Sequence, residues 1–222
     1  MYNGRVDYFL ARLPAFRRLP EEALNRLSTA FPLRRYAKGD AVFRDGDAPD
    51  SVYLLKSGLV KAVKYSPRDE PLIMQIIAPG TLFGMIAVMD KKTYPVTALS
   101  LRESEAYRIP TADFDELLKK HADFAQEVFS EVGQHVRHSQ ALRALAKEPV
   151  DKRIMYILWL LSASIGRELP ILREDIADMA GTSQETAIRA LVALRRKKLI
   201  SSKWKSITVL QPDKLKALSE PR

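Results

Sequence analysis

The side chains with the most informative chemistry are Glu185 and Arg189, four residues apart in the segment 184–194. Residues at this spacing share one face of a helix. The apolar residues of the segment recur at helical spacing on another face: Ala187, Leu191 and Leu194. If that apolar face is buried, Gln184, Glu185 and Arg189 point outward together.

Such a helix suits the DNA major groove, which admits an α-helix and shows a distinct donor and acceptor pattern for each base pair. Arg189 can donate twice to guanine O6 and N7, and Glu185 can accept from cytosine N4. Gln184 can bond adenine or reach a phosphate. Two plainer interpretations stay open: a helix salt bridge between Glu185 and Arg189, and an N-terminal cap formed by Thr182 and Glu185.

The residues before this helix complete a helix-turn-helix pattern. Residues 172–180 predict the first helix, and Gly181, Thr182 and Ser183 predict the turn. An apolar helix from Val150 to about Ser164 precedes both helices. We expect Thr182 and Ser183 to lie at the DNA backbone.

The segment Leu199–Leu210 predicts two short strands around a turn, which would add a wing to the helix-turn-helix. Lys203 and Lys205 then lie at the wing tip, where they can contact phosphates. Trp204 is unexpected in a tight turn, which usually takes Gly or Asn. It either packs on the domain or touches the DNA backbone.

Basic charge is concentrated in the same part of the chain. The 222 residues carry 36 Lys and Arg against 27 Asp and Glu, a net charge of +9. No acidic residue occurs from Thr186 to Pro212, a stretch with seven basic ones: Arg189, Arg195, Arg196, Lys197, Lys198, Lys203 and Lys205. Because phosphate contacts supply most non-specific affinity for DNA, this run favours a DNA surface over a merely solvated face.

Upstream, residues from about Phe31 to Arg108 predict an all-β region, in which short apolar runs alternate with turn glycines. Residues 52–63 predict two strands around a turn at Ser57-Gly58. Residues 72–84 predict a strand that ends at Pro79-Gly80, with a short loop up to Gly84. An acidic turn at Glu21 and Glu22 opens a helix before the β region.

From Thr111 the apolar period becomes helical, with a short helix to Lys120 and a long one over 123–146. A narrow seam recurs along the long helix: Ala125, Phe129, Val132, Val136 and Ser139. The seam indicates pairing with another helix, most simply that of a second copy, and packing on the chain's own β region is the alternative. Glu148-Pro149 breaks the pattern and predicts a hinge near 145–149.

The order and spacing of these motifs resemble the CRP/FNR superfamily of bacterial transcription regulators over nearly the whole chain. In the β region the resemblance rests on six short motifs: Tyr36-Ala-Lys-Gly-Asp40, Val42-Phe43, Gly46-Asp47, Asp50-Ser-Val-Tyr53, Ser57-Gly58 and Gly80-Thr-Leu-Phe-Gly84. In the last third it rests on three: Gly181-Thr-Ser-Gln-Glu-Thr186, Arg189 and Leu199-Ile-Ser201.

This resemblance implies an α+β fold in three parts. A cyclic-nucleotide-binding-type β jelly roll would occupy 1–120 as a sensor, a dimerisation helix 121–146, and a winged helix-turn-helix 147–222. It implies a homodimer on inverted-repeat double-stranded DNA, with half-sites about one helical turn, ~34 Å, apart. Glu185 and Arg189 match base-reading residues of the family, and an activator would also contact RNA polymerase.

The resemblance also places an effector pocket in the jelly roll: Gly80, Leu82, Phe83, Gly84, Met85, Lys92 and Thr93. Members that respond to cyclic nucleotides have Glu at the position of Met85, and Arg and Ser at those of Lys92 and Thr93. Methionine is only a weak acceptor and lysine lacks the bidentate guanidinium fork, which argues against cyclic AMP. Oxygen-sensing members hold an iron–sulfur cluster on cysteines, and a chain with no Cys excludes that cluster.

A signal other than cyclic AMP is therefore expected. Residues 88–98 resemble members that respond to nitric oxide, some of which bind haem, and His121, His135 and His138 are the available imidazole ligands. Three alternatives stay open: an unknown small-molecule effector, haem, and control by the abundance of the protein alone.

Other classes of function find little support in the sequence. Motifs of nucleophilic catalysis, nucleotide hydrolysis and zinc peptidases are missing, so we expect no catalytic residues, no metal site and no enzyme. The helix-turn-helix argues against a cyclic-nucleotide-binding module with a non-DNA output. No segment reaches the ~18 apolar residues of a membrane span, so we expect a cytoplasmic protein that does not contact the membrane.

Overall fold

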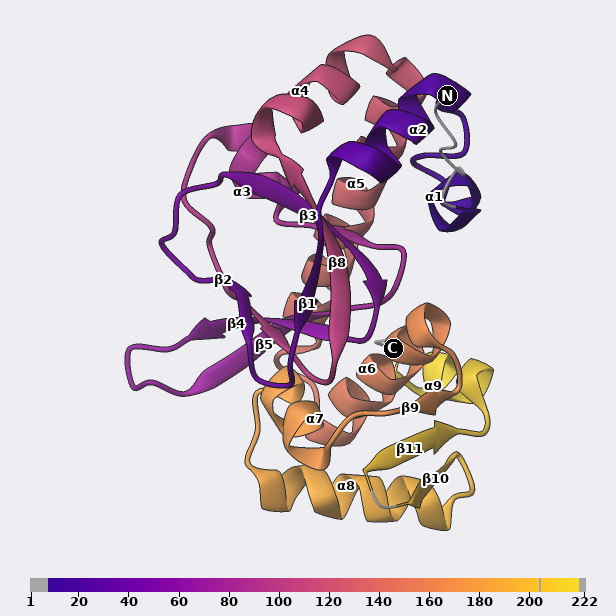
Figure 1. The fold of residues 1–222 in the computed structure, drawn as a ribbon. Helices are drawn as coiled ribbons and strands as arrows, with labels where there is room; N and C mark the ends of the chain where they lie inside the picture. Colours follow the sequence, from indigo (N-terminus) through magenta and orange to yellow (C-terminus); the bar gives the residue numbers. More distant parts are fainter. Residues whose placement is uncertain (1–7, 204, 220–222) are drawn as a thin grey trace. The chain divides into compact units, whose positions relative to one another are not determined.

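The structure, a computed structural model, describes residues 8–203 and 205–219 (Figure 1). It separates into two compact units. The first holds the chain up to Val60 together with Ile77–Arg137, and the second holds Lys61–Ile76 together with His138–Arg222.

Two expected helices of the first unit are confirmed, α2 (Glu21–Ala30) and α4 (Thr111–Lys120). The long helix α5 (Ala122–Leu145) begins in this unit and agrees with its predicted bounds to within a residue. Two short helices, α1 (Tyr8–Arg12) and α3 (Met85–Asp90), occur where no helix was expected.

The strands of the first unit form the expected jelly-roll-type β domain. One antiparallel sheet has the order β1-β8-β3-β6, with these bounds: β1 Leu33–Tyr36, β8 Ser104–Pro110, β3 Ser51–Ser57 and β6 Leu82–Phe83. In addition, β2 (Ala41–Phe43) pairs with β7 (Thr97–Ser100). Strand β6 occupies part of the segment expected as a loop between Gly80 and Gly84, where it pairs with β3.

The turn predicted at Ser57-Gly58 follows β3 and depends on its glycine. Gly58 has a φ of +94°, and a Cβ atom there would lie 2.1 Å from Ser104 Oγ and 2.6 Å from the Glu103 carbonyl oxygen. Glycine avoids both the left-handed strain and this overlap. The chain can therefore turn tightly against the start of β8.

An apolar core joins the helices of the first unit to its sheet. Phe124 of α5 packs edge-on against Phe16 and Phe114, with ring centroids 5.4 and 5.8 Å away. Val128, one turn further along α5, is fully buried. The long helix thus packs on its own domain through Phe124 and Val128, which do not belong to the predicted seam.

The second unit contains the hairpin of β4 (Val60–Tyr65) and β5 (Pro71–Ile77) and the C-terminal elements. The helices after α5 have these bounds: α6 Val150–Ile165, α7 Arg173–Ala180, α8 Gln184–Arg196 and α9 Pro212–Ser219. A three-stranded sheet has the order β10-β11-β9, with β9 Glu168–Leu169, β10 Ile200–Lys203 and β11 Ser206–Val209. The predicted helix-turn-helix and wing are confirmed, and β9 and α9 are additions to them.

Helix α6 forms the centre of the C-terminal elements. Ile154, Ile157 and Leu158 on this helix are fully buried. Lys216 of α9 lies over the ring of Trp159 on α6, with its Nζ 5.2 Å from the ring centroid. Within the part of the chain that the structure describes, no helix has the length and apolar character needed to cross a bilayer.

Candidate nucleic-acid interface

A glycine turn sets the direction in which α8 leaves α7. Gly181 ends α7 in the left-handed conformation, with φ +57°. The Thr182 N–H then donates to the Ala177 carbonyl at 3.1 Å. Glycine is the residue that most readily adopts this conformation, so the three-residue turn fixes the angle between the two helices.

The two helices pack through the apolar faces expected from the sequence. The contact residues of α8 are all buried, with Ala187 0%, Leu191 6% and Leu194 2% exposed. Ile176 and Ala180 of α7 are 0% and 5% exposed. Burial of this face leaves the opposite side of α8 to solvent.

That opposite side carries Glu185 and Arg189, two of the predicted base-reading residues. Gln184, Glu185 and Arg189 are all exposed. The guanidinium of Arg189 donates to Thr186 Oγ1 at 3.0 Å, and no ion pair with Glu185 is found among the described residues. The structure therefore places Glu185 and Arg189 together on one open helix face, and Gln184 is exposed at the N-terminal end of the helix.

The cap of α8 differs from the one expected. Ser183 is the N-cap, and its Oγ accepts from the Thr186 N–H at 3.3 Å. Thr182 lies one residue earlier, so the Thr182–Glu185 capping box is wrong. Ser183 takes this role because its backbone is extended, with φ −68° and ψ 152°, as an N-cap requires.

The wing extends the exposed surface beyond α8. Strands β10 and β11 pair from Ile200 opposite Val209 to Lys203 opposite Ser206. Lys203 and Lys205 are exposed at the tip. The prediction for Trp204 falls on a residue outside the described part of the chain.

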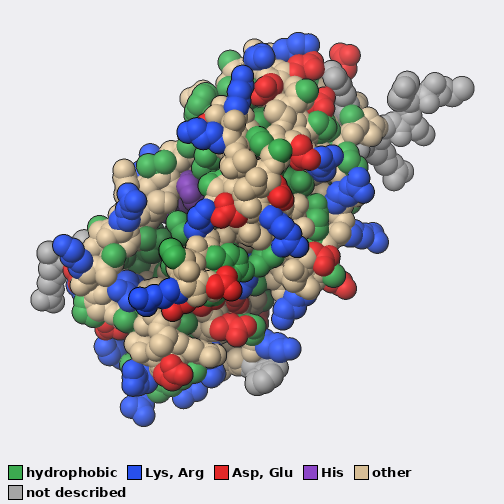
Figure 2. Space-filling model, turned by 90° about the vertical axis from the view of Figure 1, so that its left-hand side faces the viewer, with side chains coloured by type: hydrophobic (Ala, Val, Ile, Leu, Met, Phe, Trp, Pro, Cys, Tyr) green, Lys and Arg blue, Asp and Glu red, His purple; other side chains and the backbone are tan. Residues whose placement is uncertain are grey.

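The basic run that ends α8 and leads to the wing is also at the surface. Its four consecutive cations are all exposed: Arg195, Arg196, Lys197 and Lys198. In the space-filling view, Lys and Arg side chains gather at the lower end of the molecule, where Figure 1 shows α8 and β10 (Figure 2). A surface of this kind suits the phosphates of a nucleic acid.

The residues predicted to form an effector pocket divide into two groups. Leu82, Phe83 and Met85 are buried, at 2%, 5% and 8% exposed. Gly80 and Gly84 flank them with left-handed backbones. Lys92 and Thr93 are exposed instead, and Lys92 Nζ lies 3.8 Å from Asp90 Oδ2.

An aromatic cluster that the sequence analysis missed lies beside the glycine loop. Tyr94 is 1% exposed, and its ring stacks on Phe43 with centroids 3.9 Å apart. Its hydroxyl donates to the Ser51 carbonyl oxygen. Burial raises the pKa of Tyr94 above its ordinary value, so the phenol stays neutral. A Cβ on Gly84 would lie 3.1 and 3.3 Å from the rings of Tyr94 and Phe43, so these rings occupy the space next to the loop.

Glu131 is a second residue that the sequence analysis missed, because a lone Glu on a helix gives no signal of burial. It projects from α5, and the backbone N–H of Leu82 donates to its carboxyl. Its Oε2 atom is buried without a hydrogen-bond partner. Burial and the nearby Glu127 charge raise the pKa of Glu131 from 4.5 to about 7.

Two domain families match the chain. Residues 33–121 match the cyclic nucleotide-binding domain, and residues 152–218 match the Crp-like helix-turn-helix domain. The first match contains the residues predicted for the effector pocket, and the second contains the exposed residues of α8 and the wing. The chain belongs to the CRP/FNR family of transcription regulators.

Curated relatives in the CRP/FNR family span most of the chain. The transcriptional activator protein Anr of Pseudomonas protegens is 29% identical over 195 residues, which are 84% of this chain and 80% of the relative. The cyclic AMP receptor protein of Thermus thermophilus is 27% identical over 183 residues, 82% of this chain and 85% of the relative. Both relatives are named for regulation or signal reception and not for catalysis.

Solved CRP/FNR structures share the fold. FixK2 from Bradyrhizobium japonicum has a TM-score of 0.77 at 17% identity and covers 86% of this chain and 98% of its own. The regulator CLP of Xanthomonas campestris, described as responsive to c-di-GMP, has a TM-score of 0.69 at 20% identity and covers 86% and 99%.

The CRP/FNR resemblance leaves haem as an alternative, with His121, His135 and His138 as the available ligands. His121 lines a cavity of about 260 Å³. Pockets that bury drug-sized ligands measure ~300–1,000 Å³, so this cavity is too small for haem. His135 and His138 both lie on α5.

Proposed function

We propose that the protein is a dimeric, sequence-specific transcription activator that responds to a signal other than cyclic AMP. The single observation that carries DNA reading is the exposed pair Glu185 and Arg189 on a helix whose other face is buried, with Gln184 exposed at the start of the same helix. Major-groove readout needs such side chains on one helix face. Activation is proposed because the relative Anr is named as an activator, and it would require contact with RNA polymerase.

The proposed dimer uses α5. Phe129 and Val136 are 61% and 46% exposed, although both are large and apolar. They stand seven residues apart on one side of the helix, and Ala125 and Ser139 share the predicted seam. Val132, the middle residue of that seam, packs partly on the core of its own domain. A second α5 would cover the exposed pair. The dimer is proposed to bind successive major grooves with its two copies of α8.

The proposed domains are a sensor over 1–120, a dimerisation helix over 121–146 and a DNA-binding domain over 147–222. The ends of α4 at Lys120 and of α5 at Leu145, and the start of α6 at Val150, support these limits. The sensor signal is proposed to differ from cyclic AMP because Met85 is buried and Lys92 is exposed beside Asp90. Two alternatives stay open: a haem-dependent response to nitric oxide, and control by abundance, in which the protein binds DNA without any effector.

Selection from random DNA tests the proposed function directly. Purified protein should enrich an inverted repeat whose half-sites lie about one helical turn apart, and a footprint should cover both half-sites. Phe129→Glu should place charge in the α5 seam and convert dimer to monomer in analytical ultracentrifugation, whereas Gln134→Glu, exposed on the side of α5 opposite the seam, should not. Enrichment of a single half-site by a monomer would contradict the dimer but keep DNA reading, and no enrichment would contradict both.

A further inference from the structure

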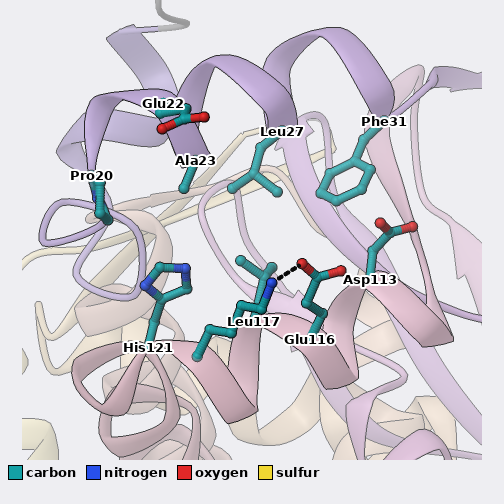
Figure 3. A pocket seen from close by; sticks show the side chains of 10 residues that line it. Pro20, Glu22, Ala23, Leu27, Phe31, Asp113, Glu116, Leu117 and His121 are labelled. Atoms are coloured by element: carbon teal, nitrogen blue, oxygen red, sulfur yellow. Dashed lines mark hydrogen bonds and ion pairs between the residues drawn. The ribbon is translucent and has the colours of Figure 1, made fainter.

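A cavity of about 260 Å³ lies in the first unit between α2 and α4 (Figure 3). Phe31 and Asp113 stand at one end of it, and Pro20 and His121 stand at the other. None of the residues predicted for the effector pocket of the jelly roll lines this cavity. It is therefore a separate candidate for a ligand.

Apolar side chains line the middle of the cavity and belong to the core of the first unit. Leu27 of α2 and Leu117 of α4 face each other across it (Figure 3). Leu27, Phe31 and Leu117 are only 4%, 7% and 7% exposed. The Phe31 N–H ends α2 by donating to the Leu27 carbonyl at 3.2 Å, which fixes the backbones of these two residues relative to each other. A ligand can thus bury an apolar body here without reordering these side chains.

The charged side chains at the rim already interact with other residues or with solvent. Lys120 Nζ donates to Glu116 Oε1 at 2.8 Å. Asp113 is also engaged in an interaction within the protein. Glu22 is exposed to solvent in the first turn of α2. A charged ligand would have to compete with these partners and with water, so the lining favours an uncharged ligand.

His121 supplies a polar group at one end of the cavity. Its backbone joins α4 to α5, because its N–H donates to the Leu117 carbonyl and its carbonyl accepts from the Ala125 N–H. Its imidazole faces the cavity (Figure 3) and makes no hydrogen bond to another residue that the structure describes. A neutral imidazole can accept a hydrogen bond from a hydroxyl group, and a charged imidazole can donate one to it. A hydroxyl group therefore fits His121 in both protonation states.

We propose that this cavity binds a small uncharged molecule with one apolar ring and one hydroxyl group, as in a phenol. A cavity of ~150 Å³ holds one benzene molecule, so 260 Å³ accommodates a substituted ring. The ring lies between Leu27 and Leu117, and the hydroxyl group bonds the imidazole of His121. Bound in this way, the ligand contacts the residue that joins α4 to the long helix.

Four probes with one ring each test the proposal: 4-methylphenol, toluene, benzylamine and benzoate. Saturation-transfer and chemical-shift titrations on the full chain at pH 7, where a phenol is neutral, give each dissociation constant. We expect 4-methylphenol to bind about three- to tenfold more tightly than toluene, which lacks the hydroxyl group. The cation benzylamine and the anion benzoate should each bind at least tenfold more weakly than 4-methylphenol. Intermolecular contacts should join the probe ring to the methyl groups of Leu27 and Leu117.

Substitutions locate the binding. His121→Leu should lower the affinity for 4-methylphenol to that for toluene, and His121→Gln, which keeps a donor and an acceptor, should restore most of the difference. Ala23→Leu should fill part of the cavity and weaken both probes about tenfold. Ala30→Leu, at an exposed position of the same helix outside the lining, is the matched control and should change neither.

Absence of binding, equal binding of 4-methylphenol and toluene, or tighter binding of either ion would overturn the proposal. Unchanged affinity in His121→Leu, equal effects of Ala23→Leu and Ala30→Leu, or ring contacts to other methyl groups would also overturn it. If Ala23→Leu does not fold, as its melting curve would reveal, the contacts to Leu27 and Leu117 still decide the location. Because the assay contains no DNA, its failure leaves the proposed DNA reading untouched.

Discussion

The face of α8 and the glycine loop of the sensor differ in how they hold their functional side chains. On α8, Glu185 and Arg189 are exposed, and the apolar residues beneath them are buried. Around the glycine loop, Phe83, Met85 and Tyr94 are buried among apolar neighbours. One surface is open to a partner before any change in structure, and the other is already filled by the chain's own side chains.

The difference between these two regions shows which polar side chains are available to a binding partner. An exposed charge is hydrated in the free protein and exchanges water for DNA at modest cost, so α8 can remain ready to bind. A buried polar group needs its own partner within the fold, and Tyr94 finds one in the Ser51 carbonyl. Glu131 breaks this rule, because its Oε2 has no partner.

Tyr94→Ala should have the largest effect of these substitutions, a loss of stability that is confined to the sensor. Loss of a buried, stacked ring costs about 3–5 kcal/mol of unfolding free energy, since the cavity left behind is only partly refilled. Tyr94→Phe keeps the stack with Phe43, loses the bond to Ser51 and should cost only about 1 kcal/mol. Chemical denaturation measures both changes. A loss below about 1 kcal/mol for Tyr94→Ala would mean that the rings do not fill this part of the sensor.

The same contrast explains what the sequence could predict. The helix-turn-helix was predictable because Gly181 and the apolar spacing of Ala187, Leu191 and Leu194 are local signals, and each residue keeps its expected environment. The packing of the sensor around its glycine loop was not predictable, because Phe43 and Tyr94 are in contact although they lie 51 positions apart in the sequence. Likewise β9 has only two residues, too few for a periodic pattern, and gains its order from pairing with β11.

On the α8 side, Arg189→Ala should lower affinity for the selected site by about 10- to 100-fold, which is ~1–3 kcal/mol. The loss should fall on one base pair of each half-site, because a bidentate contact to guanine is removed. Fluorescence anisotropy on single-base variants of the site measures it, and random DNA is the control. An equal loss of affinity for specific and random DNA would mean that Arg189 contacts the phosphate backbone and not a base.

Glu131→Gln should stabilise the sensor by about 1–2 kcal/mol at pH 8 and leave binding to DNA unchanged. Because the folded pKa of Glu131, about 7, lies above its ordinary 4.5, the folded state keeps a proton that the unfolded state releases between these pH values. The stability of the unmodified protein therefore falls as pH rises from 4.5 to 7 and then levels off for this group. The variant should lack this decline, and Glu127→Gln should show part of the same effect. Melting temperatures across pH 4.5–8 give the comparison, and parallel curves would show that Glu131 is not the group responsible.

The smallest effect is expected for Lys203→Ala at the wing tip. A lysine that contacts one phosphate adds a point charge without base information, so its loss should weaken specific and random DNA alike, by roughly two- to fivefold. The slope of log affinity against log salt should fall by about 0.9, the value for one released counterion. Anisotropy titrations at several salt concentrations measure the slope, with Lys214→Ala on α9 as the charge-matched control. A loss confined to the selected site would place Lys203 at a base edge, and the wing would then share in the sequence reading assigned to α8.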